Sequence, residues 1–368
     1  MPLSVVQKKF TNVPTESGTE FTDINGLVIC QKYIPKNIKT PGNTQPTAGK
    51  ARKFESKMLL EHFDTGQLGR NSHRLKINER VVITEKVHGT SQRTGNVLVK
   101  RAETLSRWHT FLGWLGGCGL DRNIIMDDYE TVTGTRRTVM DPQKENPNPF
   151  HEPKMRELAA ANFADLRKGE TVYYELVGYE YGDKCIMPGH DNQSLKNHLD
   201  KNDFANFINT YGERTDFTYG CAPGTFDVYV YRITYTNEDG YSVDLNWDAL
   251  VARCKELGVK HVPVLFDGTL SDFFKADTNY LDNSQTWSEE EKMDYAIELV
   301  RKWINLYCNN KFLNGREHAL EGVCIRAERE NVPLILKEKS FIFKCLEGII
   351  KDSGVLDIEE AEATAIAE

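Results

Sequence analysis

Apolar and β-branched residues recur at strand spacing along most of the chain, and this pattern most restricts the folds open to it. Strands are predicted at residues 80–86, 95–101, 171–177, 226–235, 321–327 and 333–339, and helices at 154–168 and from 288 onward. Strands and helices do not alternate strictly, as they would in a doubly wound parallel sheet. The pattern therefore predicts an α+β fold of antiparallel sheets flanked by helices.

Local signals mark where some of these elements begin and end. Gly169 is the predicted stop of the earlier helix, and a capping box of Ser288 and Glu291 is predicted to open the later one. Strand 95–101 follows strand 80–86 at hairpin distance, so the two are expected to be neighbours.

The 368 residues, 39% of them hydrophobic, can bury one large core or two modest ones. Residues 35–57 are rich in Pro, Gly, Thr, Lys and Asn and predict a linker, so residues 1–57 are assigned to an N-terminal segment. Residues 58–348 form the predicted main domain, with a loop at 142–153. Residues 349–368 form an acidic C-terminal tail.

Two classes of protein are disfavoured. The first ten residues lack an apolar leader core, and no 18-residue uncharged apolar run is present, so we expect a soluble cytoplasmic protein without a membrane span. The eight cysteines are scattered without a Cys-x-x-Cys pair, which disfavours a zinc site and predicts reduced, mostly buried thiols.

The net charge of −8 would ordinarily disfavour a nucleic-acid partner. Residues 352–368, however, contain six acidic residues and no Lys or Arg, which leaves a charge of −2 on the remainder. The useful question is therefore whether basic residues gather around one cleft.

The segment 84–91, TEKVHGTS, places Lys86 at the end of a strand and before a tight glycine turn. A lysine held in this way becomes nucleophilic if its surroundings lower its pKa, and can then attack the α-phosphate of a nucleotide. The alternative is a surface lysine beside a hairpin turn. Lys100 and Arg101, at the end of the next strand, are either cations beside the same phosphate or a solvated edge.

Three further segments carry candidate groups. Glu175 is a lone carboxylate in an apolar, aromatic strand, where a ribose hydroxyl, a cation or a structural ion pair would offset its burial. Tyr231 lies in an aromatic strand that either stacks on a base or belongs to the core. Lys337 and Lys339 project from one face of a strand, which suits a triphosphate or a solvated surface, and Glu321 could hold a divalent metal.

In their order along the chain, these segments resemble the signature of the covalent nucleotidyltransferase superfamily, which contains RNA ligases, DNA ligases and mRNA capping enzymes. The stretch 85–90, EKVHGT, is closest to the RNA ligase 2-like branch, because DNA ligases and capping enzymes usually have Asp where this chain has His88. The resemblance implies a nucleotidyltransferase domain with an ATP-grasp-like ligase core, preceded by a small N-terminal extension. It also implies ATP and Mg²⁺ or Mn²⁺ as cofactors.

The resemblance also implies a role for each site residue. Lys86 would carry AMP, Glu321 would assist the metal-dependent steps and hold the metal, and Lys337 and Lys339 would engage the phosphates. The implied nucleotide-binding residues are Glu85 near the adenine, Val87, His88, Gly89, Arg101 at the phosphate or ribose, Glu175 at the ribose hydroxyls, Tyr231 stacked on the adenine, and Arg326 at a basic position of the branch.

The implied activity is ATP-dependent joining of RNA 5′-phosphate and 3′-hydroxyl ends in a cytoplasm, which for a phage-encoded protein would be that of the host. DNA ligases and capping enzymes place an OB-fold after the last motif, and the 24 residues after Lys344 leave no room for one. A DNA ligase, a capping enzyme and a non-sealing RNA-end-binding protein are the alternatives.

Ser91 and Arg232 depart from the branch pattern, which commonly has Asn at the first position and Asp at the second. Residues 134–137, GTRR, form a basic turn that would meet a nucleic-acid backbone or remain an exposed loop.

Overall fold

The computed structural model describes eleven stretches of the chain: residues 23–24, 27–28, 54–55, 57–63, 65–104, 123–136, 138–140, 153–274, 286–307, 319–329 and 332–347. The predicted loops at 35–57 and 142–153, most of segment 1–57 and the acidic tail fall largely or wholly outside these stretches. In the described part, no helix combines the length and the apolar character needed to cross a bilayer.

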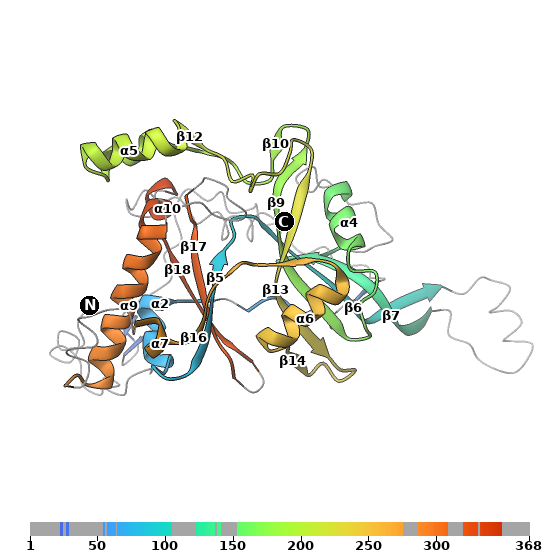
Figure 1. The fold of residues 1–368 in the computed structure, drawn as a ribbon. Helices are drawn as coiled ribbons and strands as arrows, with labels where there is room; N and C mark the ends of the chain where they lie inside the picture. The colour runs from blue at the N-terminus through green and yellow to red at the C-terminus, as the bar shows by residue number, and fades with distance from the viewer. Residues whose placement is uncertain are drawn as a thin grey trace, which may run out of the picture.

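Two β-sheets dominate the molecule (Figure 1). The five-stranded sheet has the order β16 (Val264–Thr269), β5 (Arg80–Lys86), β17 (Gly322–Ala327), β18 (Leu334–Lys339) and β4 (Gly66–Gln67). The nine-stranded sheet has the order β14 (Ser242–Asp244), β13 (Phe226–Thr236), β9 (Glu170–Tyr181), β6 (Thr90–Thr104), β7 (Asn123–Thr135) and β8 (Val139–Met140), with β10 (Lys184–Cys185), β15 (Lys260–His261) and β3 (Phe54–Glu55) paired alongside.

Among the described strands, every pair is antiparallel except β13 with β15 and β18 with β4. Two small two-stranded sheets pair β1 (Asp23–Ile24) with β2 (Leu27–Val28), and β11 (His190–Asp191) with β12 (Arg214–Thr215). The predicted α+β fold on antiparallel sheets is therefore confirmed.

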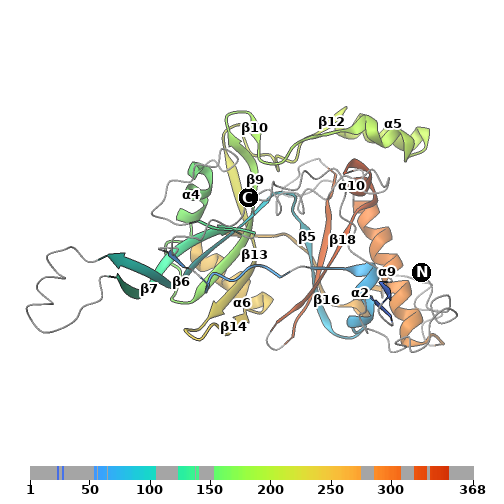
Figure 2. The same cartoon turned by 180° about the vertical axis from the view of Figure 1, so that it is seen from behind.

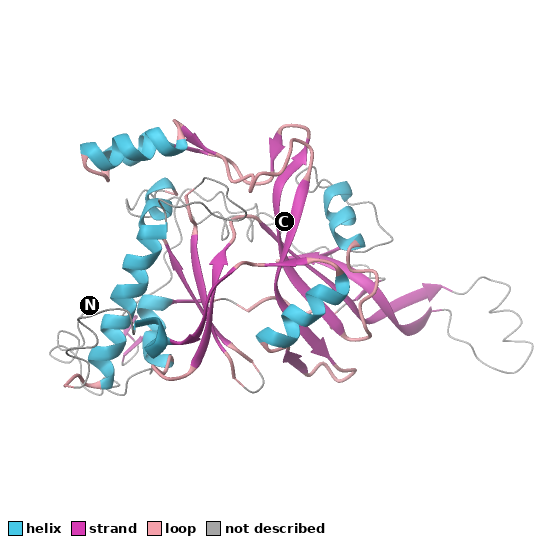
Figure 3. Ribbon diagram, in the orientation of Figure 1, coloured by secondary structure: helices cyan, strands magenta, loops and turns pink. Residues whose placement is uncertain are grey.

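Helices cover the two sheets separately, as Figures 2 and 3 show from opposite sides. The helices are α2 (Leu68–Asn71), η1 (Ser72–Arg74), α4 (Pro153–Ala161), η2 (Asn192–Asn197), α5 (Lys201–Tyr211), α6 (Trp247–Leu257), α7 (Leu270–Phe274), α9 (Glu289–Tyr307) and α10 (Phe341–Leu346). Helix α9 packs on the five-stranded sheet through its apolar stripe, whereas α4 and α6 pack on the nine-stranded sheet. Each sheet thus has its own large apolar cluster.

Both predicted helices begin within one residue of the predicted position. Ser288 and Glu291 form the predicted capping box: Glu291 Oε2 accepts the backbone N–H of Ser288 at 2.7 Å, and Ser288 Oγ accepts that of Glu291 at 3.2 Å. The earlier helix was predicted to continue to residue 168, but α4 ends at Ala161. Phe163 and Leu166 remain buried in the turns that follow, because the core requires their burial and not a helical backbone.

The predicted hairpin between strands 80–86 and 95–101 is wrong. Strand β5 pairs with β16 and β17, whereas β6 pairs with β7 and β9 in the other sheet. The chain changes sheets at residues 87–89, where Gly89 passes so close to β9 that an added Cβ would lie 2.3 Å from the carbonyl oxygen of Leu176. This crossing brings the end of β5 and the start of β6 to the same place between the sheets.

The described cysteines carry free thiols, as predicted, but most are not buried. Cys254 and Cys345 are buried, whereas Cys185, Cys221 and Cys324 are partly exposed. The expectation of mostly buried thiols therefore holds fully for two of the five described cysteines.

Candidate functional site

A pocket with about 1060 Å³ of empty space, its open mouth included, lies between the two sheets. The five-stranded side contributes Thr84, Glu85, Lys86, Cys324, Arg326 and Ile335, and the nine-stranded side contributes Thr90, Ser91, Thr135, Glu175 and Tyr231. The remaining lining residues are His62, Thr65, Val87, Gly89, Arg136, Arg156, Trp247 and Val262.

Lys86 is held at the pocket by the register of three strands. It pairs with Gly322 on β17, which pairs in turn with Lys339 on β18. An added Cβ on Gly322 would lie 2.2 Å from the carbonyl oxygen of Glu338, so only glycine allows this close pairing. The Lys86 side chain is 12% exposed, which excludes the alternative of a solvated surface lysine.

Glu321, just before β17, is the partner of Lys86. Its Oε1 lies 2.6 Å from Lys86 Nζ, and its side chain is completely buried. Burial alone would raise the pKa of Glu321, but its neighbours, chiefly Lys86, outweigh this and hold the pKa below its ordinary value. Glu321 is therefore an anion inside the protein, beside the lysine amine.

Lys339 lies in the same cluster. Its Nζ is 2.8 Å from Glu347 Oε2 and 3.7 Å from Glu321 Oε1. Only 4% of Lys339 is exposed, so the alternative of a solvated strand face is wrong for this residue. Lys337 lies on the same face of β18, as predicted, and is paired in register with the pocket residue Cys324.

His88 approaches Glu321 from the other side. Its Nδ1 lies 3.6 Å from Glu321 Oε2, and its backbone N–H donates to the hydroxyl of Tyr219 at 2.6 Å. The ring packs edge-on against Phe217 and Phe343. The histidine that distinguished the branch in the sequence is thus a buried neighbour of the Lys86–Glu321 pair.

Glu85 carries an unusual carboxyl group. Burial, followed by the charge of Glu321, raises its pKa to about 8. Its Oε1 has no hydrogen-bond partner among the residues that the structure describes. At neutral pH Glu85 is therefore mostly a neutral acid at the wall of the pocket.

The facing wall holds Glu175 and Tyr231. Ser91 on β6 pairs with Glu175 on β9, and the Ser91 and Tyr231 hydroxyls are 2.8 Å apart. Burial raises the pKa of Tyr231, so its hydroxyl stays protonated. Ser91, which stands where the branch commonly has Asn, thus has a structural role, because its side chain fixes the hydroxyl of Tyr231.

Arg232, which stands where the branch commonly has Asp, also has a structural role. Its Nε lies 2.6 Å from Asp244 Oδ1, and its guanidinium packs over the rings of Phe63 and Tyr173. Arg232 points into a buried structural cluster and does not line the pocket. It ties β14 to β13 and to the segment that precedes β4.

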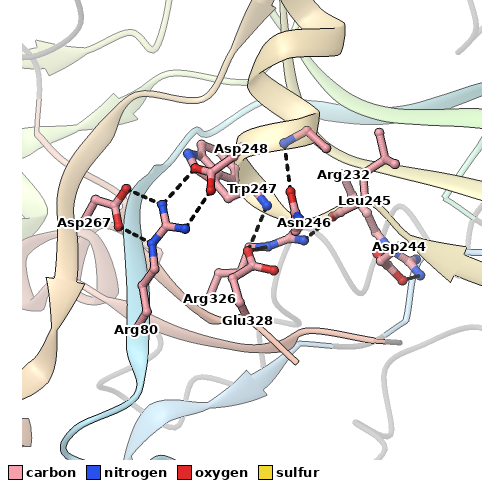
Figure 4. Close-up of polar contacts among 11 residues, drawn as sticks. Arg80, Arg232, Asp244, Leu245, Asn246, Trp247, Asp248, Asp267, Arg326 and Glu328 are labelled. Carbon is pink, nitrogen blue, oxygen red and sulfur yellow. Dashed lines mark hydrogen bonds and ion pairs between the residues drawn. The ribbon is translucent and has the colours of Figure 1, made fainter. Parts of the chain in front are cut away.

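Arg326 joins the two halves of the pocket (Figure 4). Its Nε donates to Glu328 at 2.7 Å and its Nη2 to the carbonyl of Leu245 at 2.6 Å, while Glu328 accepts the backbone N–H of Trp247. Nη1 of Arg326 is buried and has no hydrogen-bond partner among the described residues. A neighbouring bridge runs from Arg80 to Asp248 and Asp267.

Among the predicted site residues, His88, Glu321, Lys337 and Lys339 do not line the pocket, and the backbone of Arg101 lies far from it along β6. Strand β6 is continuous from Thr90 to Thr104, and its register with β7 runs from Gln92 onward without a shift. The backbone of Arg101 therefore lies eleven residues beyond the pocket residue Thr90, roughly 36 Å along an extended strand. The prediction of a nucleotide contact for Arg101 is corrected accordingly.

The pocket also contains residues that sequence analysis did not select: His62, Thr65, Arg156 and Trp247. Arg156, on α4, donates to Gln92 Oε1 at 3.1 Å and to Thr90 Oγ1 at 3.0 Å. Arg136 lies in the basic turn noted in the sequence. His62 and Arg156 had no signal, because both come from segments without a recognisable motif.

Basic residues gather around the pocket, which answers the question raised by the negative net charge of the chain. Four cations line the pocket, Lys86, Arg136, Arg156 and Arg326, against the two carboxyl groups of Glu85 and Glu175. Because Glu85 is mostly neutral at pH 7, the balance is positive in a chain whose net charge is −8. The site is thus suited to an anionic ligand.

The sequence model of the RNA ligase family matches residues 79–346. This match covers more than half of the chain and all of the predicted site residues, so the chain belongs to the RNA ligase family. A search of curated proteins finds no match.

Three of the solved structures to which this chain is similar are RNA or DNA ligases. A Naegleria gruberi RNA ligase with PPi shares 11% identity at a TM-score of 0.41, over 83% of this chain and 62% of that one. An archaeal ATP-dependent RNA ligase shares 15% at 0.36, over 78% and 50%. A putative ATP-dependent DNA ligase from Aquifex aeolicus shares 11% at 0.37, over 77% and 50%. This chain spans less than two thirds of each.

Proposed function

We propose that this protein is an ATP-dependent RNA ligase that joins 5′-phosphate and 3′-hydroxyl ends through a lysyl-AMP and an adenylated 5′ end. The observation that carries the proposal is the position of Lys86. Its amine contacts the buried carboxylate of Glu321 and faces a pocket whose opposite wall holds Glu175 and Tyr231. Membership of the RNA ligase family supports the same reaction class.

In the first step the Lys86 amine loses a proton and attacks the α-phosphorus of ATP. A P–N bond forms, the bond from the α-phosphorus to the bridging oxygen breaks, and pyrophosphate leaves. Glu321 orients the amine, and Lys337 and Lys339 are the proposed cations for the departing phosphates. Glu175 would bind the ribose hydroxyls and Tyr231 would stack on the adenine.

In the second step an oxygen of the RNA 5′-phosphate attacks the same phosphorus, and the P–N bond breaks to return the amine. In the third step the 3′-hydroxyl attacks the 5′-phosphate, AMP leaves and the phosphodiester forms. The proposed catalytic unit is residues 58–348, with residues 1–57 and 349–368 as flanking segments. Negative charge grows on phosphate oxygens at every step, which explains the need for fixed cations around the pocket.

A divalent metal fits this site through Glu321. One oxygen of Glu321 binds Lys86, and the other, 3.6 Å from His88 Nδ1, has no hydrogen-bond partner among the described residues. The described residues contain no cluster of three His, Cys, Asp or Glu side chains. Mg²⁺ in nucleotide sites usually takes one or two carboxylates, with phosphates and waters completing the shell. When bound, such a metal would neutralise charge on the phosphates.

The test is a covalent-adduct assay with α-³²P-labelled nucleotides and Mg²⁺. Wild-type protein should retain label from ATP and not from GTP, and Lys86→Ala should retain none. Lys76→Ala, which removes an exposed lysine before the same strand, is the matched control and should behave as wild type. Label from GTP alone would indicate a capping enzyme, and no label a protein that binds without sealing. Sealing of nicked RNA but not nicked DNA would complete the proposal.

A further inference from the structure

The basic turn at the end of β7 is held by a buried arginine. Nη1 of Arg93 donates to the carbonyl of Thr135 at 2.8 Å and also to the carbonyl of Arg136. Arg93 is 2% exposed, and its partner in register is Gly134. The turn also closes on itself, because the backbone N–H of Thr135 donates to the carbonyl of Thr138 at 2.8 Å. The backbone of Arg136 is thus fixed from inside the protein.

This support carries an energetic cost. A guanidinium taken out of water must recover its lost hydration through hydrogen bonds, and Arg93 Nε has no partner among the residues described. An ordinary surface hairpin needs no such group. A buried arginine that supports this turn is explained if a ligand needs the turn in one position. Such a ligand would lie in the pocket, because Thr135 and Arg136 both line it.

The strand order shows which part of a ligand meets Arg136. In the nine-stranded sheet β13, β9, β6 and β7 are successive neighbours, and they present Tyr231, Glu175, Ser91 and Thr135 to the pocket in that order. Neighbouring strands lie about 4.8 Å apart, so Arg136, next to Thr135, is roughly 14 Å from the strand of Tyr231. A nucleotide with its base at Tyr231 and its ribose at Glu175 directs its phosphates toward β6, and Arg136 lies beyond them.

The group next to the α-phosphate on that side is also a phosphate, either of the triphosphate or of the polynucleotide end. On the five-stranded side Lys339 and Lys337 are the cations already proposed for the triphosphate, whereas Arg136 directly follows β7 on the opposite sheet. We propose that Arg136 binds the 5′-phosphate of the RNA end that receives AMP, and that Arg93 is the positioning residue that holds Arg136 in place. This inference rests on the proposed ligase reaction.

The experiment separates the two half-reactions. Lysyl-AMP formation is measured first with labelled ATP, and transfer of AMP from the preformed adduct to 5′-phosphorylated RNA is measured next, over a range of NaCl concentrations. Arg136→Ala should form the adduct within twofold of wild type but transfer AMP about 10- to 100-fold more slowly at low RNA concentration, since a charge-assisted hydrogen bond contributes about 1.5–3 kcal/mol. The slope of log rate against log salt should fall by about 0.7.

Three variants complete the design. Arg136→Lys should restore the salt slope and part of the rate, and Arg93→Met should show the Arg136→Ala pattern. Arg167→Ala removes an exposed arginine outside the pocket and should match wild type. If Arg93→Met does not fold, the Arg136 variants still test the inference, because Arg136 is only half-buried.

Equal losses in adduct formation and in transfer would mean that Arg136 contacts the triphosphate, and would overturn the inference. Unchanged transfer with an unchanged salt slope would overturn it as well. A wild-type protein that forms no adduct would instead refute the proposed ligase function, so the two failures are distinguishable.

Discussion

The Nζ atom of Lys86 lies 2.6 Å from Oε1 of Glu321, although the two residues are 235 positions apart in the chain. The contact exists because β5 and β17 are adjacent and place Lys86 opposite Gly322, the residue after Glu321. Lys339 approaches the same oxygen from β18 at 3.7 Å. The buried carboxylate of Glu321 therefore lies within ion-pair distance of two lysine side chains.

Glu321→Gln should destabilise the protein, because Lys86 would lose its buried carboxylate partner, while Lys339 would keep Glu347 at 2.8 Å. Breaking a buried pair in this way costs about 3–5 kcal/mol. Chemical denaturation measures the loss. The double variant Glu321→Gln with Lys86→Met should recover part of it, since the charge left without its partner is then removed. Equal stability of the single and double variants would contradict the pairing.

Glu85→Gln should change how stability depends on pH. The pKa of Glu85 is about 8 in the folded protein against an ordinary 4.5, so between these values the folded state holds a proton that the unfolded state has lost. Its contribution to stability is therefore full below pH 4.5 and is lost as pH rises toward 8, by at most about 1.4 kcal/mol per pH unit. The variant's stability relative to wild type should rise through this window and level off above it. A constant difference from pH 5 to 8 would show that Glu85 ionises normally.

His62→Ala should weaken ATP binding with little effect on the rate at saturation. The His62 ring meets the Tyr231 ring edge-on at 5.1 Å and lines the pocket, so it fixes the proposed stacking surface. Such aromatic pairs contribute about 0.5–1.5 kcal/mol, which corresponds to a roughly 2- to 12-fold rise in KM for ATP in adduct formation. His62→Phe should restore KM, and His73→Ala, at an exposed site, should have no effect. A fall in kcat with unchanged KM would argue against this role.

Gly89→Ala should reduce adduct formation by about 100-fold or more, because a 1 Å displacement at an active site can have this effect. The added Cβ would lie 2.3 Å from the carbonyl of Leu176 and would displace β9, which carries Glu175. Gly182→Ala is the control, since its Cβ would meet nothing within 4 Å. Gly182 has φ +46, so that variant should lose about 1 kcal/mol of stability and keep its activity. Similar adduct yields from both variants would show that the close approach at Gly89 is unimportant.

The sequence by itself determined the fold class and several of the strands, and it pointed to most of the residues proposed for the site, but it did not reveal β7 (Asn123–Thr135) or β16 (Val264–Thr269). Alternation of apolar residues depends on burying one face of a strand, which is a local property, so strands such as β5, β9, β13, β17 and β18 were predicted nearly at their observed bounds. The chemical identity of Lys86, Glu175 and Glu321 was also visible, because a charged residue in an apolar strand needs a partner wherever the strand lies.

The tertiary structure decided which strands are neighbours, and with it the composition of the pocket. Spacing along the chain suggested that β5 and β6 pair, but the close passage of Gly89 over β9 sends them into different sheets. The uninterrupted length of β6 carries Arg101 away, and the pairing of β6 with β7 brings Arg136 in. His62 and Arg156 arrive from segments with no motif, because packing between distant parts of the chain depends on three-dimensional complementarity that no local pattern records.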